Sequence, residues 1–227
     1  ILNKLKEFNE LEVDMIELRI DFYENIHQED ALRNLFLNIA ALQIQKPVIL
    51  TIRTAAEGGE VEIDPKDYFN VYKLAVEANA FDIYDVELAL GTNMAIELRT
   101  LIHDAGKYML MSSHNFDRTP EVDSLMQKFR SMDSLEADIM KVAVMPEDYQ
   151  DLLNLLSFTV QAKHEYAQKP IVTMSMSSIG LTSRLVGEQF GSAITFASVG
   201  KASAPGQIDY QELNQMLDII HKNIQEA

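Results

Sequence analysis

One lysine stands in the middle of an otherwise apolar stretch, Glu136–Pro146 (EADIMKVAVMP). Lys141 has Met140 and Val142 as its immediate neighbours, a pattern typical of a buried strand. In a fully apolar setting the charged form of an amine is disfavoured, and a neutral amine attacks a ketone to form a Schiff base. The other interpretation is that Lys141 reaches from a strand edge to water, and this stretch alone favours that second interpretation.

Further residues that could do chemistry fall where apolar segments end. Glu17, Arg19 and Asp21 alternate along the chain, so on a strand they would point to one face and need partners or a wet cavity. At least one of the three is expected to belong to a structural ion pair. The other residues of this kind are Arg53, Glu57, Asp85, Glu87 and His114.

His114 differs from the other histidines because it ends an apolar segment, the one that precedes the Lys141 segment along the chain. A lysine that forms an imine beside a histidine that moves protons is a recognisable pairing for chemistry next to a carbonyl. No pattern resembles HExxH, an EF-hand or a nucleotide phosphate loop. A metal or a nucleotide phosphate is therefore not expected.

Apolar segments rich in Val, Ile and Met alternate with amphipathic ones at roughly 30-residue spacing, which predicts βαβ units and a parallel sheet. About seven strands and about eight helices, starting with a helix, fit a (β/α)8 barrel that lacks its first strand. We expect one such domain over residues 1–227. An open doubly wound sheet is the competing architecture, but its Gly-rich turn after the first strand is absent. The expected strands are 13–21, 47–52, 81–87, 107–114, 136–146, 170–176 and 193–199.

Composition narrows the classes of function. The 227 residues include no Cys, which excludes disulfides, thiolate metal sites and cysteine nucleophiles and fits a reducing cytoplasm. No apolar run approaches the ~18–20 residues that span a bilayer. A formal charge of −16 argues against nucleic acid or an anionic membrane as partner. An anionic substrate would have to be held by a few local arginines.

Two segments near the C-terminal end complete the pattern. SMSSIGLTSR places Arg184 beyond the strand expected at 170–176, and KASAPGQ (Lys201–Gln207) follows the last expected strand. The second segment is rich in turn residues and could move over the mouth of a barrel. It could equally be an ordinary surface loop, because Ala-Pro-Gly is common turn chemistry.

Together these motifs resemble those of type I 3-dehydroquinate dehydratase, a lyase of the shikimate pathway that forms a Schiff base. They occur in the family's order and cover nearly the whole chain. The motifs are ELRID (Glu17–Asp21), TIRTAAEGG (Thr51–Gly59), SSHNF (Ser112–Phe116), DIMKVAVMP (Asp138–Pro146), TMSM (Thr173–Met176), SR (Ser183–Arg184), GSAITFA (Gly191–Ala197) and ASAPGQ (Ala202–Gln207).

The resemblance implies roles for particular residues. Lys141 is similar to the family's imine-forming lysine, His114 to its general acid and base, and Glu57 to the acidic partner of that histidine. The positions that match substrate-contacting residues are Glu17, Arg19, Arg53, Arg184, Ser203 and Gln207. Those that match the apolar wall of the site are Met174, Met176 and Phe196.

The resemblance further implies a (β/α)8 barrel in the cytoplasm, usually a homodimer, which acts on 3-dehydroquinate and needs no metal or organic cofactor. The family's first barrel strand precedes the matched motifs, so we expect this chain to lack that strand. Two other functions stay open. One is a class I aldolase, which uses the same lysine chemistry, and the other is a catalytically impaired homologue that only binds a metabolite.

Overall fold

The computed structural model describes residues 1–200 and 204–225 and divides the chain into two compact units. The first unit comprises Ile1–Ser112 and Leu135–Asp138, and the second comprises Ser113–Ser134 and Ile139–Ala227. The predictions of a single domain, of a closed barrel and of a missing first strand stay predictions.

In the first unit, strands and helices alternate, and the strands pair in parallel in chain order, as the sequence predicts. The strands are β1 (Ile16–Arg19), β2 (Val48–Thr51), β3 (Ile83–Glu87) and β4 (Tyr108–Asn115), whose last three residues belong to the second unit. The α-helices are α1 (Leu2–Asn9), α2 (Glu29–Ala40), α3 (Pro65–Glu77) and α4 (Thr92–Asp104), and the short 3-10 helices are η1 (Ile20–Phe22), η2 (Ala55–Glu57) and η3 (Leu88–Leu90).

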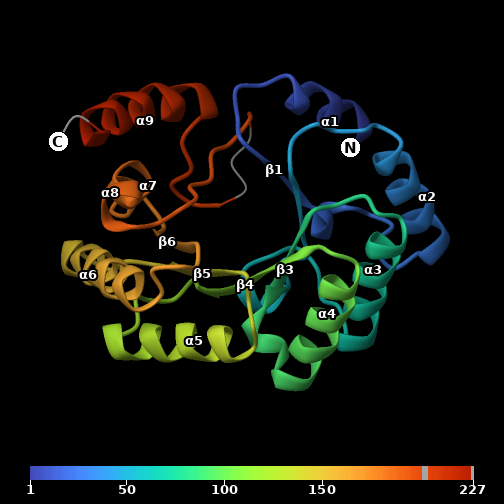
Figure 1. Cartoon of the computed structure of the whole chain (residues 1–227), viewed down its shortest axis with the longest axis horizontal. Coiled ribbons are helices and arrows are strands. Elements are labelled where there is room, and N and C mark those ends of the chain that lie inside the picture. The colour runs from blue at the N-terminus through green and yellow to red at the C-terminus, as the bar shows by residue number, and fades with distance from the viewer. Residues whose placement is uncertain (201–203, 226–227) are drawn as a thin grey trace. The chain divides into compact units, whose positions relative to one another are not determined.

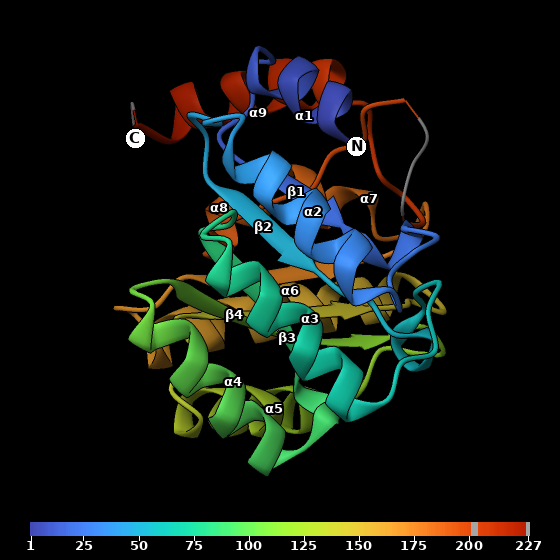
Figure 2. The same cartoon turned by 90° about the vertical axis from the view of Figure 1, so that its right-hand side faces the viewer.

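Local chemistry explains where the helices of the first unit begin and how they pack. The Asp64 carboxylate accepts a hydrogen bond from the Asp67 amide, and Pro65 occupies the first helical position of α3, where a missing N–H costs nothing. Figure 2 shows α2, α3 and α4 as neighbours. The rings of Phe36 and Phe81 meet edge to face with centroids 5.4 Å apart, which joins α2 to the residues just before β3.

The second unit repeats the parallel pattern with β5 (Ile139–Val144) and β6 (Ile171–Ser175). Its helices are α5 (Val122–Ser134), α6 (Tyr149–Glu165), α7 (Leu181–Leu185), α8 (Gly187–Phe190) and α9 (Tyr210–Gln225). Figure 1 shows α5 and α6 side by side. Phe129 and Phe158 hold these two helices together, with ring centroids 5.0 Å apart.

The strand predicted at residues 193–199 is wrong, because the structure assigns no strand there. The Ala193 amide donates to the Ile171 carbonyl at 2.7 Å, which is a single pairing beside β6. The Ser198 amide donates instead to the Ile208 carbonyl at 2.8 Å, and the Tyr210 amide donates back to Ser198. The far end of this segment therefore pairs with the loop that follows it rather than extending a ladder.

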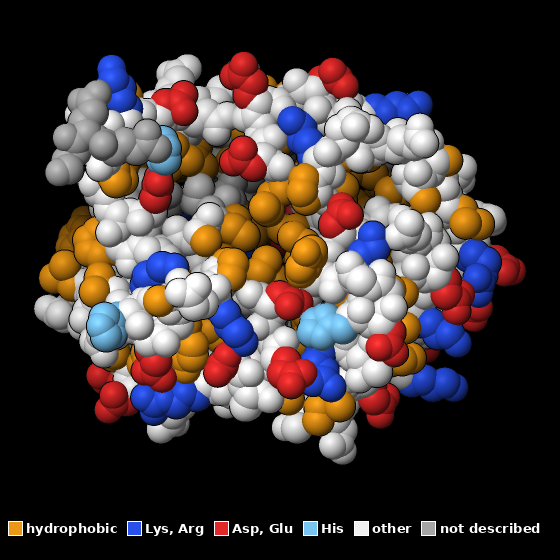
Figure 3. Space-filling model, viewed as in Figure 1, with side chains coloured by type: hydrophobic (Ala, Val, Ile, Leu, Met, Phe, Trp, Pro, Cys, Tyr) orange, Lys and Arg blue, Asp and Glu red, His pale blue; other side chains and the backbone are white. Residues whose placement is uncertain are grey.

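The surface carries charges of both signs. On the face shown in Figure 3, Lys and Arg side chains are scattered among Asp and Glu side chains. Among the described residues, no helix has the length and apolar character needed to cross a membrane.

Candidate active site

A buried arginine organises the polar residues of the first unit. Arg53 follows β2 and has 3% of its surface exposed. Its Nη2 donates to the Asp85 carboxylate at 2.8 Å, and its Nη1 donates to the Glu87 carboxylate at 2.8 Å. Nη1 also lies 3.0 Å from the Ser112 hydroxyl and 3.4 Å from Glu57 Oε2. Three segments of the unit, β3, β4 and η2, thus supply partners to one guanidinium.

Arg53 and the carboxylates of Asp85, Glu87 and Glu57 form a buried ion-pair network, called here the Arg53 cluster. Burial opposes the charge on Arg53, but the carboxylates of Asp85, Glu87 and Glu57 outweigh that effect and raise the pKa of the guanidinium above its ordinary value. A buried charge with several good partners is costly to leave unpaired. Arg53 therefore serves the unit's stability, whatever else it contacts.

A glycine permits the close turn that positions Glu57. The chain folds back after Glu57 so that the Gly59 amide donates to the Thr54 carbonyl at 2.8 Å. A Cβ atom added to Gly59 would lie 1.9 Å from the Arg53 carbonyl oxygen, so only glycine fits at this position. The Gly-Gly pair of the TIRTAAEGG motif thereby keeps Glu57 within reach of the Arg53 guanidinium.

The sequence had suggested that Glu17, Arg19 and Asp21 share one face of a single strand, but only Glu17 and Arg19 lie on the strand. β1 ends at Arg19, and Asp21 lies in the 3-10 helix that follows. Arg19 and Asp21 form a two-pronged ion pair with both distances at 2.7 Å, which confirms the expected structural pair. Glu17 accepts a hydrogen bond from the Thr51 hydroxyl at 2.9 Å. The substrate-contacting roles predicted for Glu17, Arg19 and Arg53 stay predictions.

In the second unit, Lys141 is buried on β5, with 4% of its surface exposed. The register pairs Lys141 with Val172 and Ala143 with Met174, so Lys141 and Met174 lie on the same face of neighbouring strands. The Lys141 ammonium lies 4.4 Å from the centre of the Phe196 ring, within the range of a cation–π contact. The lysine is thus turned inward rather than reaching out to solvent.

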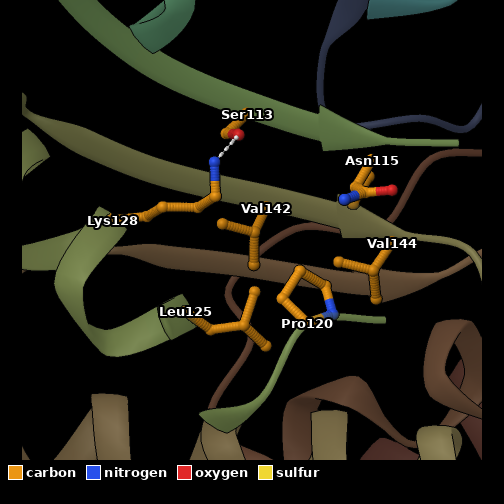
Figure 4. A pocket seen from close by; sticks show the side chains of 8 residues that line it. Ser113, Asn115, Pro120, Leu125, Lys128, Val142 and Val144 are labelled. Atoms are coloured by element: carbon orange, nitrogen blue, oxygen red, sulfur yellow. Dashed lines mark hydrogen bonds between the residues drawn. The ribbon is translucent and has the colours of Figure 1, made fainter. Parts of the chain in front are cut away.

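His114 lies on the same face as Lys141. Ser113 and Asn115 of β4 line a small pocket with Val142 and Val144 of β5, on the side covered by α5 (Figure 4). Side chains alternate along a strand, so the residues between them point to the opposite face. Those residues are His114 and Ala143, and Lys141 points the same way because it precedes Val142.

Arg184 of α7 contrasts with Arg53 because its partners in the described part of the chain are all uncharged. With 2% of its surface exposed, it donates to the Phe196 carbonyl at 3.4 Å and the Pro205 carbonyl at 3.2 Å, and it contacts Met174 Sδ at 3.7 Å. Its Nε atom is buried without a hydrogen-bond partner. Burial lowers the pKa of this guanidinium from its ordinary value. Such a site favours an anion.

The remaining predicted residues lie in the second unit. Met176 is buried just after β6, and its amide donates to the Val144 carbonyl at 2.8 Å. The Gln207 side chain accepts from the Ala204 amide at 3.3 Å, which braces the turn that also supplies the Pro205 carbonyl. Ser203 lies outside the described residues. The predicted partnership of Glu57 with His114 stays a prediction, because the two residues belong to different units.

Sequence reasoning missed two contacts. It noted Asp85 and Glu87 at a strand end, but nothing in the sequence says that both carboxylates bind Arg53. Lys128 was not noted at all, although a signal was present. It falls at helical spacing among Leu125, Phe129 and Met132, the buried residues of α5, and a lysine in such a stripe needs a partner.

Comparisons with known proteins agree over almost the whole chain. A family model described as Type I 3-dehydroquinase matches residues 1–224. The chain is 41% identical over 223 residues to 3-dehydroquinate dehydratase of Bacillus subtilis (strain 168), covering 98% of this chain and 88% of that protein. It is 37% identical over 220 residues to 3-dehydroquinate dehydratase of Clostridium novyi (strain NT), covering 97% and 86%.

Solved structures give the same result. The crystal structure of type I 3-dehydroquinate dehydratase from Clostridium difficile, with covalently modified comenic acid, matches with a TM-score of 0.93 at 36% identity, covering 98% of this chain and 87% of that one. The 3-dehydroquinate dehydratase of Enterococcus faecalis matches with a TM-score of 0.88 at 36% identity, covering 96% and 87%. The matched range includes the Lys141 segment and the Arg53 cluster.

Proposed function

The chain belongs to the type I 3-dehydroquinase family, and on this premise we propose that it is a hydro-lyase of the shikimate pathway that converts 3-dehydroquinate to 3-dehydroshikimate. The reaction removes one water from the substrate. The family assigns this reaction class, and the residues of the second unit supply groups suited to each of its steps.

In the proposed mechanism, Lys141 condenses with the C3 ketone and releases water to form an iminium. The iminium draws electrons from the adjacent C2–H bond, and His114 accepts that proton. His114 then donates a proton to the C1 hydroxyl as the C1–O bond breaks. Water finally hydrolyses the imine and restores the Lys141 amine, so the net change is the loss of one water.

The observation that carries this proposal is the shared contact of Lys141 and Arg184 with Phe196. The Lys141 ammonium lies over the Phe196 ring, and Arg184 donates to the Phe196 carbonyl. Phe196 therefore contacts both of these buried side chains. A small molecule that carries both a ketone and a carboxylate fits that arrangement, because a guanidinium binds a carboxylate with two parallel hydrogen bonds.

The decisive variant for the proton steps is His114→Ala. We expect turnover to fall by at least about 100-fold, which is the lower range for general acid–base catalysis, while borohydride still traps the substrate on Lys141. His164→Ala, which changes an exposed histidine on α6, is the control. Near-normal turnover by His114→Ala would remove His114 from the mechanism.

Product analysis together with borohydride trapping distinguishes the dehydratase from an aldolase and from a metabolite-binding protein. Cleavage of a carbon–carbon bond without dehydration would identify an aldolase. Trapping of 3-dehydroquinate on Lys141 without any turnover would identify a metabolite-binding protein. Only release of 3-dehydroshikimate supports the dehydratase.

We propose in addition that the protein is a homodimer. The outer side of α6 exposes Tyr149, Leu153 and Val160, which lie on one side of the helix by their spacing. Exposed apolar stripes of this kind mark association surfaces. Sedimentation of the protein and of its Leu153→Lys variant tests this, and a monomer in both cases would contradict it. The predicted cytoplasmic location stays a prediction.

A further inference from the structure

A lysine on the helix side of β4 contacts the residue next to His114. The Lys128 ammonium donates to the Ser113 hydroxyl at 2.9 Å, from α5 to β4 (Figure 4). Among the described residues this is the only hydrogen bond of the ammonium, and no carboxylate there forms an ion pair with it. A bond to a charged donor is about twice as strong as one between neutral groups.

Apolar side chains flank the Lys128–Ser113 pair. The pocket beside it is lined by Pro120, Leu125, Val142 and Val144, and the space is too narrow for a water molecule. Lys128 is half-buried beside these apolar side chains, and its ammonium donates to the buried Ser113 hydroxyl. The Lys128–Ser113 bond fixes the end of β4 against α5.

The residue on the other side of His114 is fixed as well. The Asn115 side chain accepts hydrogen bonds from the amides of Asp117 and Arg118, both at 2.9 Å. The Thr119 hydroxyl then donates to the Met145 carbonyl at 3.0 Å, which ties the loop after β4 to the end of β5. His114 stands between two anchored neighbours and points away from α5.

We propose that Lys128, through Ser113, is a positioning residue for His114. The inference rests on the proposed function, because it assigns Lys128 to the proton-transfer steps of that reaction. A displacement of about 1 Å in a reacting group can cost about 100-fold in rate. The Lys128–Ser113 bond holds the backbone of β4 at the place where such a displacement of the imidazole would arise.

The test is Lys128→Met, which keeps the apolar stem and removes the ammonium. We expect kcat for dehydration to fall about 10-fold, with borohydride trapping of the substrate on Lys141 unchanged, because imine formation does not require the same alignment. Lys163→Met is the matched control, since Lys163 is a helix lysine of the same unit whose ammonium donates, among the described residues, only to the Ala167 carbonyl. It should leave kcat unchanged.

Two further variants separate positioning from general loss of structure. Ser113→Ala removes the acceptor while α5 keeps its sequence, and it should reproduce the fall in kcat. In a His114→Ala background, Lys128→Met should have no further effect on the residual rate, because the residue that it positions is gone. Thermal unfolding measured on every variant confirms that each is folded.

The outcomes are distinct for the inference and for the function on which it rests. If His114→Ala loses turnover while Lys128→Met and Ser113→Ala keep the original kcat, the positioning role is wrong and the function stands. An equal fall in both the original and the His114→Ala backgrounds also overturns the positioning role. Normal turnover by His114→Ala overturns the proposed proton steps themselves.

Discussion

The two buried arginines of this protein are equally hidden but differently partnered. Arg53 is 3% exposed and bonds to three carboxylates and a serine within the first unit. Arg184 is 2% exposed and, in the described part of the second unit, meets only two carbonyls and a thioether. Burial opposes the charge in both cases, yet the pKa of Arg53 is raised and that of Arg184 is lowered.

This difference in partners distinguishes an arginine that stabilises the fold from one that is available to a ligand. A buried cation that is surrounded by carboxylates already has its counter-charges, so its removal damages the fold. A buried cation that has only neutral partners is held in an unfavourable state, which an anionic ligand would relieve. The first pattern is that of an internal ion-pair network, and the second fits the binding role proposed for Arg184.

The largest effect is expected from Arg53→Met. The variant leaves the carboxylates of Asp85, Glu87 and Glu57 buried without their cation, so the free energy of unfolding should fall by about 3–5 kcal/mol. Denaturant unfolding measures it. Arg33→Met, an exposed arginine of the same unit that pairs with Glu29 and Glu77, is the control and should change little. Equal stability of the two variants would remove the structural role of Arg53.

Arg184→Met should give the reverse result, with stability kept and binding lost. The loss of charged hydrogen bonds to a carboxylate is worth about 1.5–3 kcal/mol, which corresponds to a rise in KM of about 10- to 150-fold. Steady-state kinetics and thermal unfolding are measured on the same sample, with Arg130→Met on the exposed side of α5 as control. An unchanged KM would contradict the carboxylate-binding role.

The effect of alkali on stability should be concentrated in the first unit. Burial is the main cause that raises the pKa values of Tyr68, Tyr72 and Tyr84. Unfolded tyrosines ionise near pH 10 while these three keep their protons in the folded state, so the unfolded state binds fewer protons above that pH. Stability is therefore unaffected below about pH 10 and falls above it, by up to about 1.4 kcal/mol per tyrosine per pH unit.

The Tyr84→Phe variant tests this prediction at a single buried tyrosine. The Tyr84 hydroxyl is buried and has no hydrogen-bond partner, so its removal should raise stability at pH 7 by about 1 kcal/mol and reduce the slope above pH 10. Tyr108→Phe, at an exposed tyrosine of the same unit, is the control. Urea unfolding at pH 7, 10 and 11 measures both quantities. A loss of stability at pH 7 would show that the hydroxyl has a partner in solution.

The sequence predicted the parallel order of strands and helices well, because each element carries its own local signal. Val, Ile and Met dominate β2, β5 and β6, and Asp64-Pro65 begins α3 where a capped helix start is expected. It failed at residues 193–199. Their apolar pattern is that of a strand, but the choice of hydrogen-bond partner depends on the loop that follows, which periodicity does not reveal.

The candidate site was predicted as far as residue types and strand ends allow. Lys141 was identified because a lysine inside an apolar strand is rare enough to need a reason. The sequence did not reveal that Asp85 and Glu87 both bind Arg53, because these contacts depend on the register that places them beside β2. The Lys128–Ser113 bond joins a helix to a strand, and such a contact follows from packing rather than from spacing along the chain.

Imine formation by Lys141 is tested by borohydride reduction in the presence of 3-dehydroquinate, followed by mass spectrometry of the digested protein. We expect one stable adduct on the peptide that carries Lys141, absent from Lys141→Met, which should also be inactive. An active enzyme whose Lys141 stays unmodified, or an adduct on another lysine, would contradict it.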